Sequence, residues 1–226
     1  MSSYGQFCPV AKAMEVLDER WTLLVLRELL LGSTHFNELR RGVPKMSPAL
    51  LSKRLKSLER YGLVTREGTQ GQTTYQLTDA GRELAPVIDG LGAWGLRWIG
   101  DLGETDLDPH LLMWDIRRTV PIDRWPRRRT VVSFVLQGAR AAGSHWWLVV
   151  SDGEADLCDV DPGYEVNAVV TGSLRALTRL WRGDISWPQA VRGGEVAISA
   201  NSLVVRQIPA WLGQSRLAAT PRVQVG

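Results

Sequence analysis

The sequence predicts an α+β fold in two parts, a mostly helical N-terminal part and a smaller C-terminal part in which strands precede helices. Apolar residues recur at helical spacing through most of the first hundred residues, whereas short runs rich in Val and Trp, bounded by turn residues, begin near Thr130. At 226 residues the chain also exceeds the commonest size of one domain. We therefore expect domains at residues 1–100 and 128–226, joined by a helix and linker at 101–127.

Positive charge is concentrated in the N-terminal part. Residues 1–100 hold 13 Lys and Arg against 10 Asp and Glu, while residues 101–226 hold 14 of each. Between Arg40 and Arg66 there are eight basic residues and one acid, Glu59. This asymmetry predicts that the N-terminal part binds a polyanion and that the C-terminal part has another role.

Four helices are predicted before residue 62. Pro9 suits the first position of one helix, and the nearly apolar run 21–31 indicates a second, buried helix. Ser33 or Thr34 can cap a short third helix over residues 35–40. The fourth helix starts with a side-chain cap and a proline at its first position, Ser47 and Pro48.

The fourth helix has one apolar and one cationic face. Leu51, Leu55 and Leu58 recur at i, i+4 and i+7 and should pack inward. Lys53, Lys56 and Arg60 recur at i, i+3 and i+7 on the other side. The preceding short helix and turn give the order of a helix-turn-helix, and the runs 63–67 and 73–77 read as a hairpin, or wing. A solvated basic face is the alternative. We expect DNA contacts from Ser47, Ala49, Ser52, Lys53, Arg54, Lys56, Arg66 and Gln70.

A long helix is predicted after the wing, from Asp79 to about Ile99, with Thr78 as its cap. Its apolar stripe is broader than a lone surface helix requires, and Gly90, among other glycines, keeps it thin. We interpret it as a contact between two copies of the chain. Packing against the chain's own second half is the alternative.

Four segments in order carry a family resemblance. Residues 8–29, 35–41, 47–55 and 75–81 closely resemble the HxlR-type winged helix-turn-helix regulators of bacteria. The resemblance covers residues 7 to about 99. It implies a homodimer that binds double-stranded DNA at a near-palindromic operator, with one recognition helix per half-site. The wing tip, residues 69–72, is shorter and less basic than in many such proteins.

Cys8 precedes the first helix and has two interpretations. Some members of this family sense oxidants or electrophiles through the cysteine before that proline, and a helix N-terminus favours a thiolate. The alternative is a small residue retained for packing. The second domain offers the chain another way to receive a signal.

The C-terminal half contains strands followed by helices. Strands are expected at 130–136, 146–150, 155–160 and 166–171, with a tight turn at Asp152 and Gly153, and Ser173 should cap a helix. Residues 169–183 and 190–199 resemble the sterol-carrier-protein-like fold, over about 128–213. That resemblance implies an apolar cavity for a lipid or other small molecule. Its candidate lining residues are Phe134, Trp146, Trp147, Leu177, Trp181 and Trp211.

Other classes of function have little support. The two cysteines and three scattered histidines show no metal-ligand spacing, and no catalytic or cofactor motif occurs. We therefore expect neither an enzyme nor a cofactor. No apolar run approaches the roughly 20 residues of a membrane helix, so we expect a cytoplasmic protein. The leading hypothesis is a transcriptional regulator modulated by an apolar small molecule. A redox regulator acting through Cys8 and a lipid carrier that does not bind DNA are the alternatives.

Overall fold

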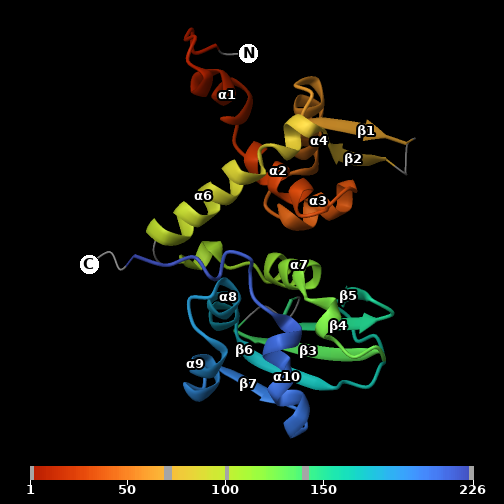
Figure 1. Cartoon of the computed structure of the whole chain (residues 1–226). Coiled ribbons are helices and arrows are strands. Elements are labelled where there is room, and N and C mark those ends of the chain that lie inside the picture. The colour runs from red at the N-terminus through yellow and green to blue at the C-terminus, as the bar shows by residue number, and fades with distance from the viewer. Residues whose placement is uncertain (1–2, 69–72, 100–101, 139–142, 224–226) are drawn as a thin grey trace. The chain divides into compact units, whose positions relative to one another are not determined.

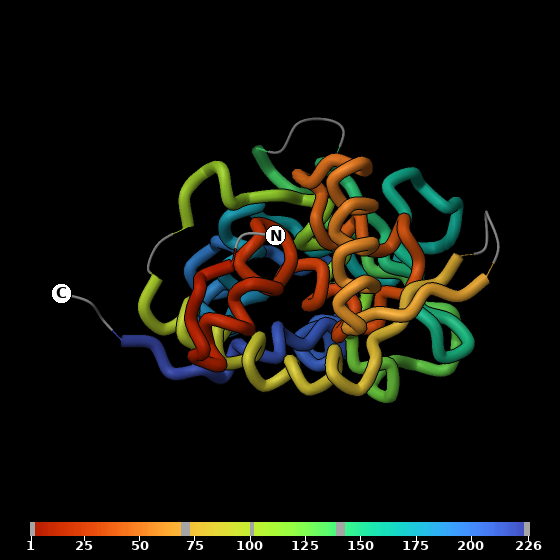
Figure 2. The backbone as a smooth tube through the Cα atoms, turned by 90° about the horizontal axis from the view of Figure 1, so that it is seen from above, coloured from red at the N-terminus to blue at the C-terminus, as the bar shows by residue number. Residues whose placement is uncertain are grey.

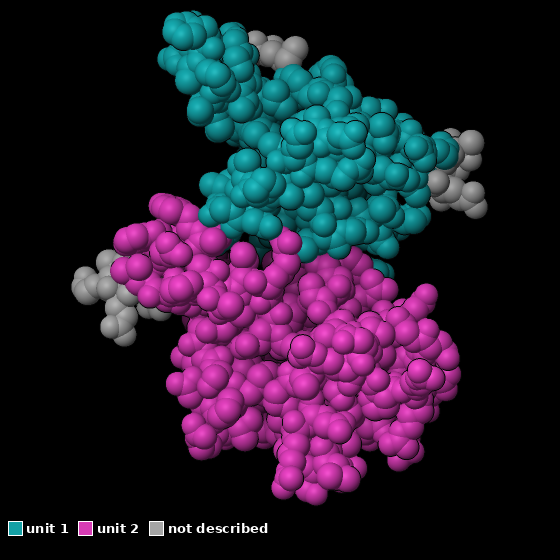
Figure 3. Space-filling view, in the orientation of Figure 1, with its two compact units in different colours: residues 1–92 teal, residues 93–226 magenta. Residues whose placement is uncertain are grey.

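The computed structural model describes residues 3–68, 73–99, 102–138 and 143–223. Within these ranges the chain forms two compact units, residues 1–92 and 93–226 (Figure 3). Each unit has its own buried apolar cluster. The two units are described separately below.

The first unit is built from short helices and a two-stranded hairpin (Figure 1). Its core takes apolar side chains from five helices and the first strand, including Val25, Leu26, Leu39, Leu51 and Leu55. The predicted hairpin is confirmed, with strands paired antiparallel in the register Val64 to Leu77. The elements are α1 (Pro9–Leu17), α2 (Thr22–Leu30), α3 (Phe36–Gly42), α4 (Pro48–Arg60), β1 (Val64–Glu67), β2 (Thr74–Leu77) and α5 (Asp79–Arg82).

Helix α3 is capped differently from the prediction. Neither Ser33 nor Thr34 supplies the cap. The carboxylate of Glu38, in the first turn, reaches back and accepts from the backbone N–H groups of Thr34 at 2.9 Å and His35 at 3.0 Å. These donors precede the helix and have no partner within it, so a first-turn acid satisfies them as in a capping box.

The predicted helix from Asp79 to Ile99 is two helices. Helix α5 ends at Arg82, and α6 (Ala85–Trp98) begins two residues later. Pro86, at the second position of α6, explains the break, because proline lacks an N–H group and is tolerated only in the first turn of a helix. Ile88 of α6 packs into the first core. The helix continues past residue 92 into the second unit.

A tight contact joins α2 and α3. A Cβ atom added to Gly42 would overlap the carboxylate of Glu28, which is fully buried. Arg27 donates to the Glu28 carboxylate and, at 3.0 Å, to the carbonyl oxygen of Gly42. The glycine is therefore required for space, so that a buried ion pair can fit between the helices.

The second unit contains a five-stranded sheet in the order β5-β4-β3-β6-β7 (Figure 1). Strands β3 and β6 pair in parallel and the other neighbours are antiparallel. The elements are α7 (Pro109–Thr119), β3 (Thr130–Gln137), β4 (His145–Ser151), β5 (Glu154–Cys158), β6 (Ala168–Ser173), α8 (Leu174–Arg182), α9 (Trp187–Arg192), β7 (Val196–Ser199) and α10 (Ser202–Leu212), with short 3-10 helices at Glu104–Asp106 and Ile122–Arg124.

The tight turn and the helix cap predicted for this half are confirmed. Asp152 and Gly153 both have positive φ, at 55° and 81°, as the tight turn between β4 and β5 requires. The Ser173 hydroxyl accepts from the N–H of Ala176 at 3.0 Å and caps α8, and Gly183 ends that helix in the left-handed region.

Residues 101–127, expected to be a helix and an exposed connection, contribute to the second core. Leu112, Met113 and Ile116 of α7 are buried in it. Trp125, which lies in the expected linker, is 6% exposed and stacks on Trp211 with ring centroids 5.2 Å apart. Its indole N–H donates to the Trp211 carbonyl oxygen at 2.6 Å. The proline and arginine content of this segment indicated an exposed loop. The buried Trp125 instead attaches the segment to the second unit.

Candidate nucleic-acid interface

Helix α4 presents a cationic face while its apolar face is sealed in the first core. Leu51, Leu55 and Leu58 are at most 1% exposed, which confirms their predicted orientation. Ser47 caps the helix by accepting from the N–H of Leu50 at 3.3 Å. Lys53 and Lys56 are exposed on the opposite face. Figure 2 shows the chain passing from α4 directly into the hairpin.

The cationic face borders a shallow hollow of about 360 Å³. Predicted DNA-contact residues line it together, among them Ala49, Ser52, Lys53 and Lys56. Ala49 is exposed and Ser52 is half-buried. The hollow thus combines small side chains, which permit close approach, with lysines whose ammonium groups can reach phosphates. Its remaining lining residues are Glu19, Arg54, Ser57 and Arg60.

Arg54 differs from its neighbours because its side chain is buried. The residue is 8% exposed, its Nε donates to the Arg20 carbonyl oxygen at 3.0 Å, and its guanidinium forms an ion pair with Glu19. These bonds tie α4 to the turn before α2. Arg54 is among the predicted DNA contacts, but its guanidinium is bonded to Arg20 and Glu19 in the structure.

The structure describes one of the two predicted wing contacts, Arg66. Arg66 is exposed on β1, opposite Tyr75 of β2. The N–H of Tyr75 donates to the Thr34 carbonyl oxygen at 2.8 Å, so the hairpin is attached to the start of α3. Gln70 lies outside the described residues.

Arg60 is a further cation of this face that the candidate set omitted. It is exposed, lines the hollow, and donates to the Ser57 hydroxyl at 3.2 Å. Its spacing was the available signal, since it lies seven residues, or two turns, after Lys53.

Cys8 occupies the N-cap position of α1. The side chain is half-buried, and it makes no capping hydrogen bond. Its carbonyl oxygen accepts from the N–H of Lys12 at 3.0 Å, which starts the helix. The other cysteine, Cys158, lies on β5, where burial and then the nearby carboxylates of Asp156 and Asp159 raise the pKa of its thiol.

The predicted ligand-pocket residues divide into two groups. Phe134, Leu177 and Trp181 meet at an apolar cavity in the second core, with a volume of about 20 Å³. Roughly 10–15 Å³ is needed for one water molecule, and ligand pockets usually hold about 300–1,000 Å³. The cavity that these three residues line is therefore too small for such a ligand.

The other three tryptophans do not line that cavity. Trp211 stacks on Trp125. Trp146 meets His110 edge to face at 5.0 Å, and its indole N–H donates to the Gly143 carbonyl oxygen at 2.9 Å. Trp147 points to the other face of β4, half-buried, and stacks on His145. The alternation of a strand separates the two adjacent tryptophans, as the sequence indicated.

No group of three or more His, Cys, Asp or Glu side chains in residues 3–68, 73–99, 102–138 and 143–223 is arranged to hold a metal ion. Within the same ranges, no helix has both the length and the apolar character that crossing a bilayer demands.

Known proteins match the part of the chain that contains this interface. The family model for HxlR-like helix-turn-helix proteins matches residues 16–102. The HTH-type transcriptional regulator YvaP of Bacillus subtilis is 39% identical over 99 residues, covering 42% of this chain and 92% of YvaP. An HTH-type transcriptional regulator of Synechocystis is 34% identical over 98 residues, covering 42% of this chain and 73% of the relative.

Among solved structures, the reduced form of the transcriptional regulator YodB from B. subtilis is 30% identical with a TM-score of 0.37. The match covers 42% of this chain and 100% of YodB. The capped cationic helix, the helices it packs on from residue 22 onward and the hairpin that follows it all fall within residues 16–102, which the family model matches. The chain belongs to the HxlR-like helix-turn-helix family of DNA-binding transcriptional regulators.

Proposed function

We propose that this regulator reads duplex DNA with α4, which enters the major groove from its N-terminal end. The observation that supports this most is the hollow where Ala49, Ser52, Lys53 and Lys56 meet on the exposed face of a capped helix. Ser47, Ala49 and Ser52 lie nearest the bases, and Lys53, Lys56 and Arg66 contact phosphates. Arg54 holds the helix in place from the buried side.

Salt dependence of DNA affinity tests this assignment. Each lysine that neutralises a phosphate releases counterions, so Lys53→Ala and Lys56→Ala should each flatten the slope of log K against log salt by about 0.9 on duplex DNA. The measurement is fluorescence anisotropy of a labelled duplex at several salt concentrations. Lys12→Ala is the matched control, because Lys12 pairs with Glu15 on α1 and should leave the slope unchanged. Unchanged slopes in both α4 variants would contradict the phosphate contacts.

A second copy of the chain is the proposed partner of α6. Val87, Leu91, Trp94 and Trp98 follow each other at spacings of four, three and four residues, and each is about half exposed in the single chain. This spacing is typical of the apolar stripe along which two helices pack. In a dimer with twofold symmetry, each copy contributes the same stripe to the contact. Two recognition helices then face half-sites about 34 Å apart, which predicts a near-palindromic operator.

The C-terminal unit is the proposed receiver of a small-molecule signal. Its support is the arrangement of helices and five strands, together with the resemblance of residues 169–183 and 190–199 to sterol-carrier-like proteins. An apolar ligand between sheet and helices requires the core to open, because the cavity at Phe134, Leu177 and Trp181 has room for about one water. Native mass spectrometry of freshly purified protein identifies any such ligand.

A redox regulator is the second candidate, and Cys8 favours it. The thiol lies at the N-cap of α1, half-buried and without a capping bond. Loss of an oxidant response in Cys8→Ser, with the small-molecule response retained, distinguishes this route. The lipid-carrier alternative predicts that selection from a random duplex library yields no preferred DNA site.

A further inference from the structure

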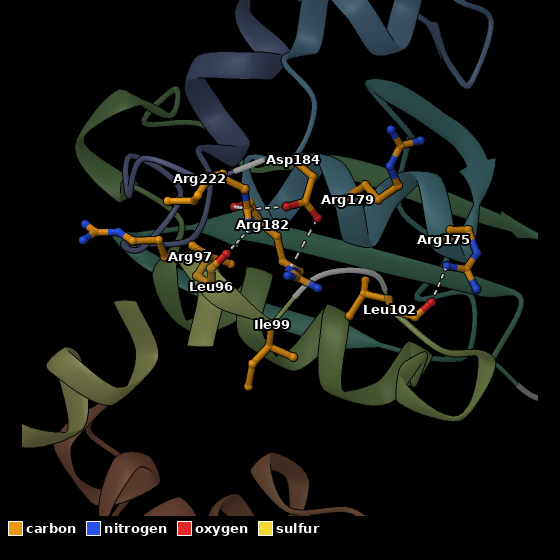
Figure 4. Close-up of a pocket in the computed structure, with 10 residues that line it drawn as sticks. Leu96, Arg97, Ile99, Leu102, Arg175, Arg179, Arg182, Asp184 and Arg222 are labelled. Atoms are coloured by element: carbon orange, nitrogen blue, oxygen red, sulfur yellow. Dashed lines mark hydrogen bonds and ion pairs between the residues drawn. The ribbon is translucent and has the colours of Figure 1, made fainter. Parts of the chain in front are cut away.

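The second unit carries a surface hollow that is distinct from its apolar core and is rich in arginine. Its volume is about 290 Å³, near the lower end of the range for small-molecule sites. Its apolar lining residues are Leu96, Ile99, Leu102 and Val223. Its charged lining residues are five arginines and Asp184 (Figure 4).

Three of the arginines come from one face of α8. Arg175, Arg179 and Arg182 recur at i, i+4 and i+7, while Leu177 and Leu180 on the opposite face are buried in the core. Residues at that spacing lie one above another along a helix, so the hydrophobic packing of α8 places the three arginines on the side of the helix that lines the hollow.

Neighbouring groups already engage two of these arginines. Arg175 donates to the Leu102 carbonyl oxygen at 2.7 Å and pairs with Glu104. Arg179 pairs with Glu195 at 2.8 Å. The charge of each of these arginines is balanced by a carboxylate of its own, so neither is the main anchor.

Arg182, Arg222 and Asp184 form the centre of the hollow. Arg222 pairs with Asp184 and donates at 3.0 Å to the carbonyl oxygens of both Leu96 and Arg182. The Nε of Arg182 lies 3.5 Å from Asp184, and in Figure 4 its guanidinium is located between Asp184 and the side chains of Ile99 and Leu102. Arg97 points away from this centre.

The charge of this centre selects the ligand. Arg182 and Arg222 carry two positive charges against the single negative charge of Asp184, and all three side chains are at most 28% exposed. Partly buried excess charge is costly unless it is paired. A carboxylate supplies one negative charge and two oxygens that match the planar fork of a guanidinium.

We propose that this hollow binds a small apolar monocarboxylate, with its carboxylate at Arg182 and Arg222 and its apolar body against Leu96, Ile99, Leu102 and Val223. The inference rests on the proposed function, which assigns signal reception to the C-terminal unit. It adds the place where the ligand binds and the negative charge that the ligand carries. Arg222 also holds the Leu96 carbonyl near the end of α6. The bound ligand therefore acts next to the helix proposed to join two copies.

Octanoate is a suitable probe, titrated calorimetrically into the full chain without DNA. A ligand of ten non-hydrogen atoms should bind one site per chain with a Kd on the order of 0.1–1 mM. Octanol lacks the charge and acetate lacks the apolar body, so each should bind at least tenfold more weakly. Equal affinity for octanol or for acetate, or no saturable binding of octanoate, overturns the proposal.

Variants locate the site. Arg182→Gln should weaken octanoate binding at least tenfold, whereas the control Arg206→Gln, at an exposed arginine of α10, should not. Val223→Asp is a second variant that places a carboxylate in the hollow at a half-exposed position, with little demand on the fold. It should weaken octanoate binding by a larger factor than octanol binding, because both ligands lose an apolar contact but only octanoate is repelled by the new carboxylate. Wild-type affinity in both hollow variants overturns the site. Since DNA is absent, failure here leaves the salt-slope test of α4 intact.

Discussion

Lys53 and Arg54 are adjacent in α4, yet their side chains have opposite surroundings. Lys53 is exposed at the hollow, and Arg54 is 8% exposed with its guanidinium bonded to Glu19 and Arg20. A step of one residue turns a helix by about 100°, so neighbouring cations can face solvent and core. The basic character of a position therefore does not by itself make it a DNA contact.

Arg54→Ala and Lys53→Ala should have contrasting effects on stability. Loss of Arg54 removes hydrogen bonds from a charged donor and leaves the Arg20 carbonyl unpaired, so the free energy of unfolding should fall by about 1–3 kcal/mol. Lys53→Ala should change it by less than about 0.5 kcal/mol, as expected for an exposed position. Urea denaturation of the full chain measures both. Equal stability of the two variants would show that the Arg54 bonds do not anchor α4.

At the scale of elements, helix ends are determined by bonds that reach across a turn. In α3 the cap is the Glu38 carboxylate, which binds the N–H groups of Thr34 and His35. In the region after the wing, Pro86 divides one expected helix into α5 and α6. Both features follow from the four unpaired N–H groups at every helix start, which an acid satisfies and a proline lacks.

The α3 cap predicts a pH-dependent stability. Burial by itself raises the pKa of Glu38, but the backbone N–H groups of His35 and Thr34 outweigh it and hold that pKa below its usual value. A carboxylate with a lowered pKa in the folded state stabilises the protein above its unfolded pKa, and this contribution is lost as pH falls through the folded pKa. Glu38→Ala should therefore cost about 0.5–2 kcal/mol at pH 7 and progressively less below about pH 4.

Urea unfolding of wild type and Glu38→Ala across this pH range measures the difference. Glu59→Ala is the matched control, since Glu59 is exposed on α4. A cost for Glu38→Ala that stays constant from pH 7 to pH 3 would exclude the charged cap.

At the scale of the whole molecule, helix α6 has large apolar side chains that are exposed to solvent in a single chain. Ile88 packs into the first core, while Trp94 and Trp98 are 57% and 49% exposed. Large aromatic side chains in a continuous exposed stripe mark contact surfaces. Gly90 has no atom within 4 Å of the position of an added Cβ, so a partner helix can approach closely there.

Trp94→Glu should shift the protein from dimer to monomer. A tryptophan at the centre of an interface contributes about 2 kcal/mol or more, equivalent to roughly a thirtyfold weaker dimer. Sedimentation equilibrium measures the dissociation constant, and near-UV circular dichroism confirms that the chain remains folded. The control is Leu203→Glu, because Leu203 is an exposed apolar residue of α10, away from the stripe. If both variants behave as wild type, α6 is not the dimer contact.

Periodicity, caps and turn residues determined much of this protein from sequence alone. They predicted the inward face of α4, the hairpin, the turn at Asp152 and Gly153, and the cap of α8. Each depends on residues close in sequence, where spacing fixes which side chains share a face. The segments that resemble HxlR proteins are local in the same sense, and the family match covers residues 16–102.

Only the tertiary structure decided which side chains meet across long sequence separations. It paired Arg54 with Glu19, stacked Trp125 on Trp211, and filled the space between Phe134 and Trp181. It also brought Arg182 and Arg222 together on Asp184, from positions forty residues apart. The physical reason is that burial and charge pairing depend on which elements pack together, and residue spacing within a single element does not specify that.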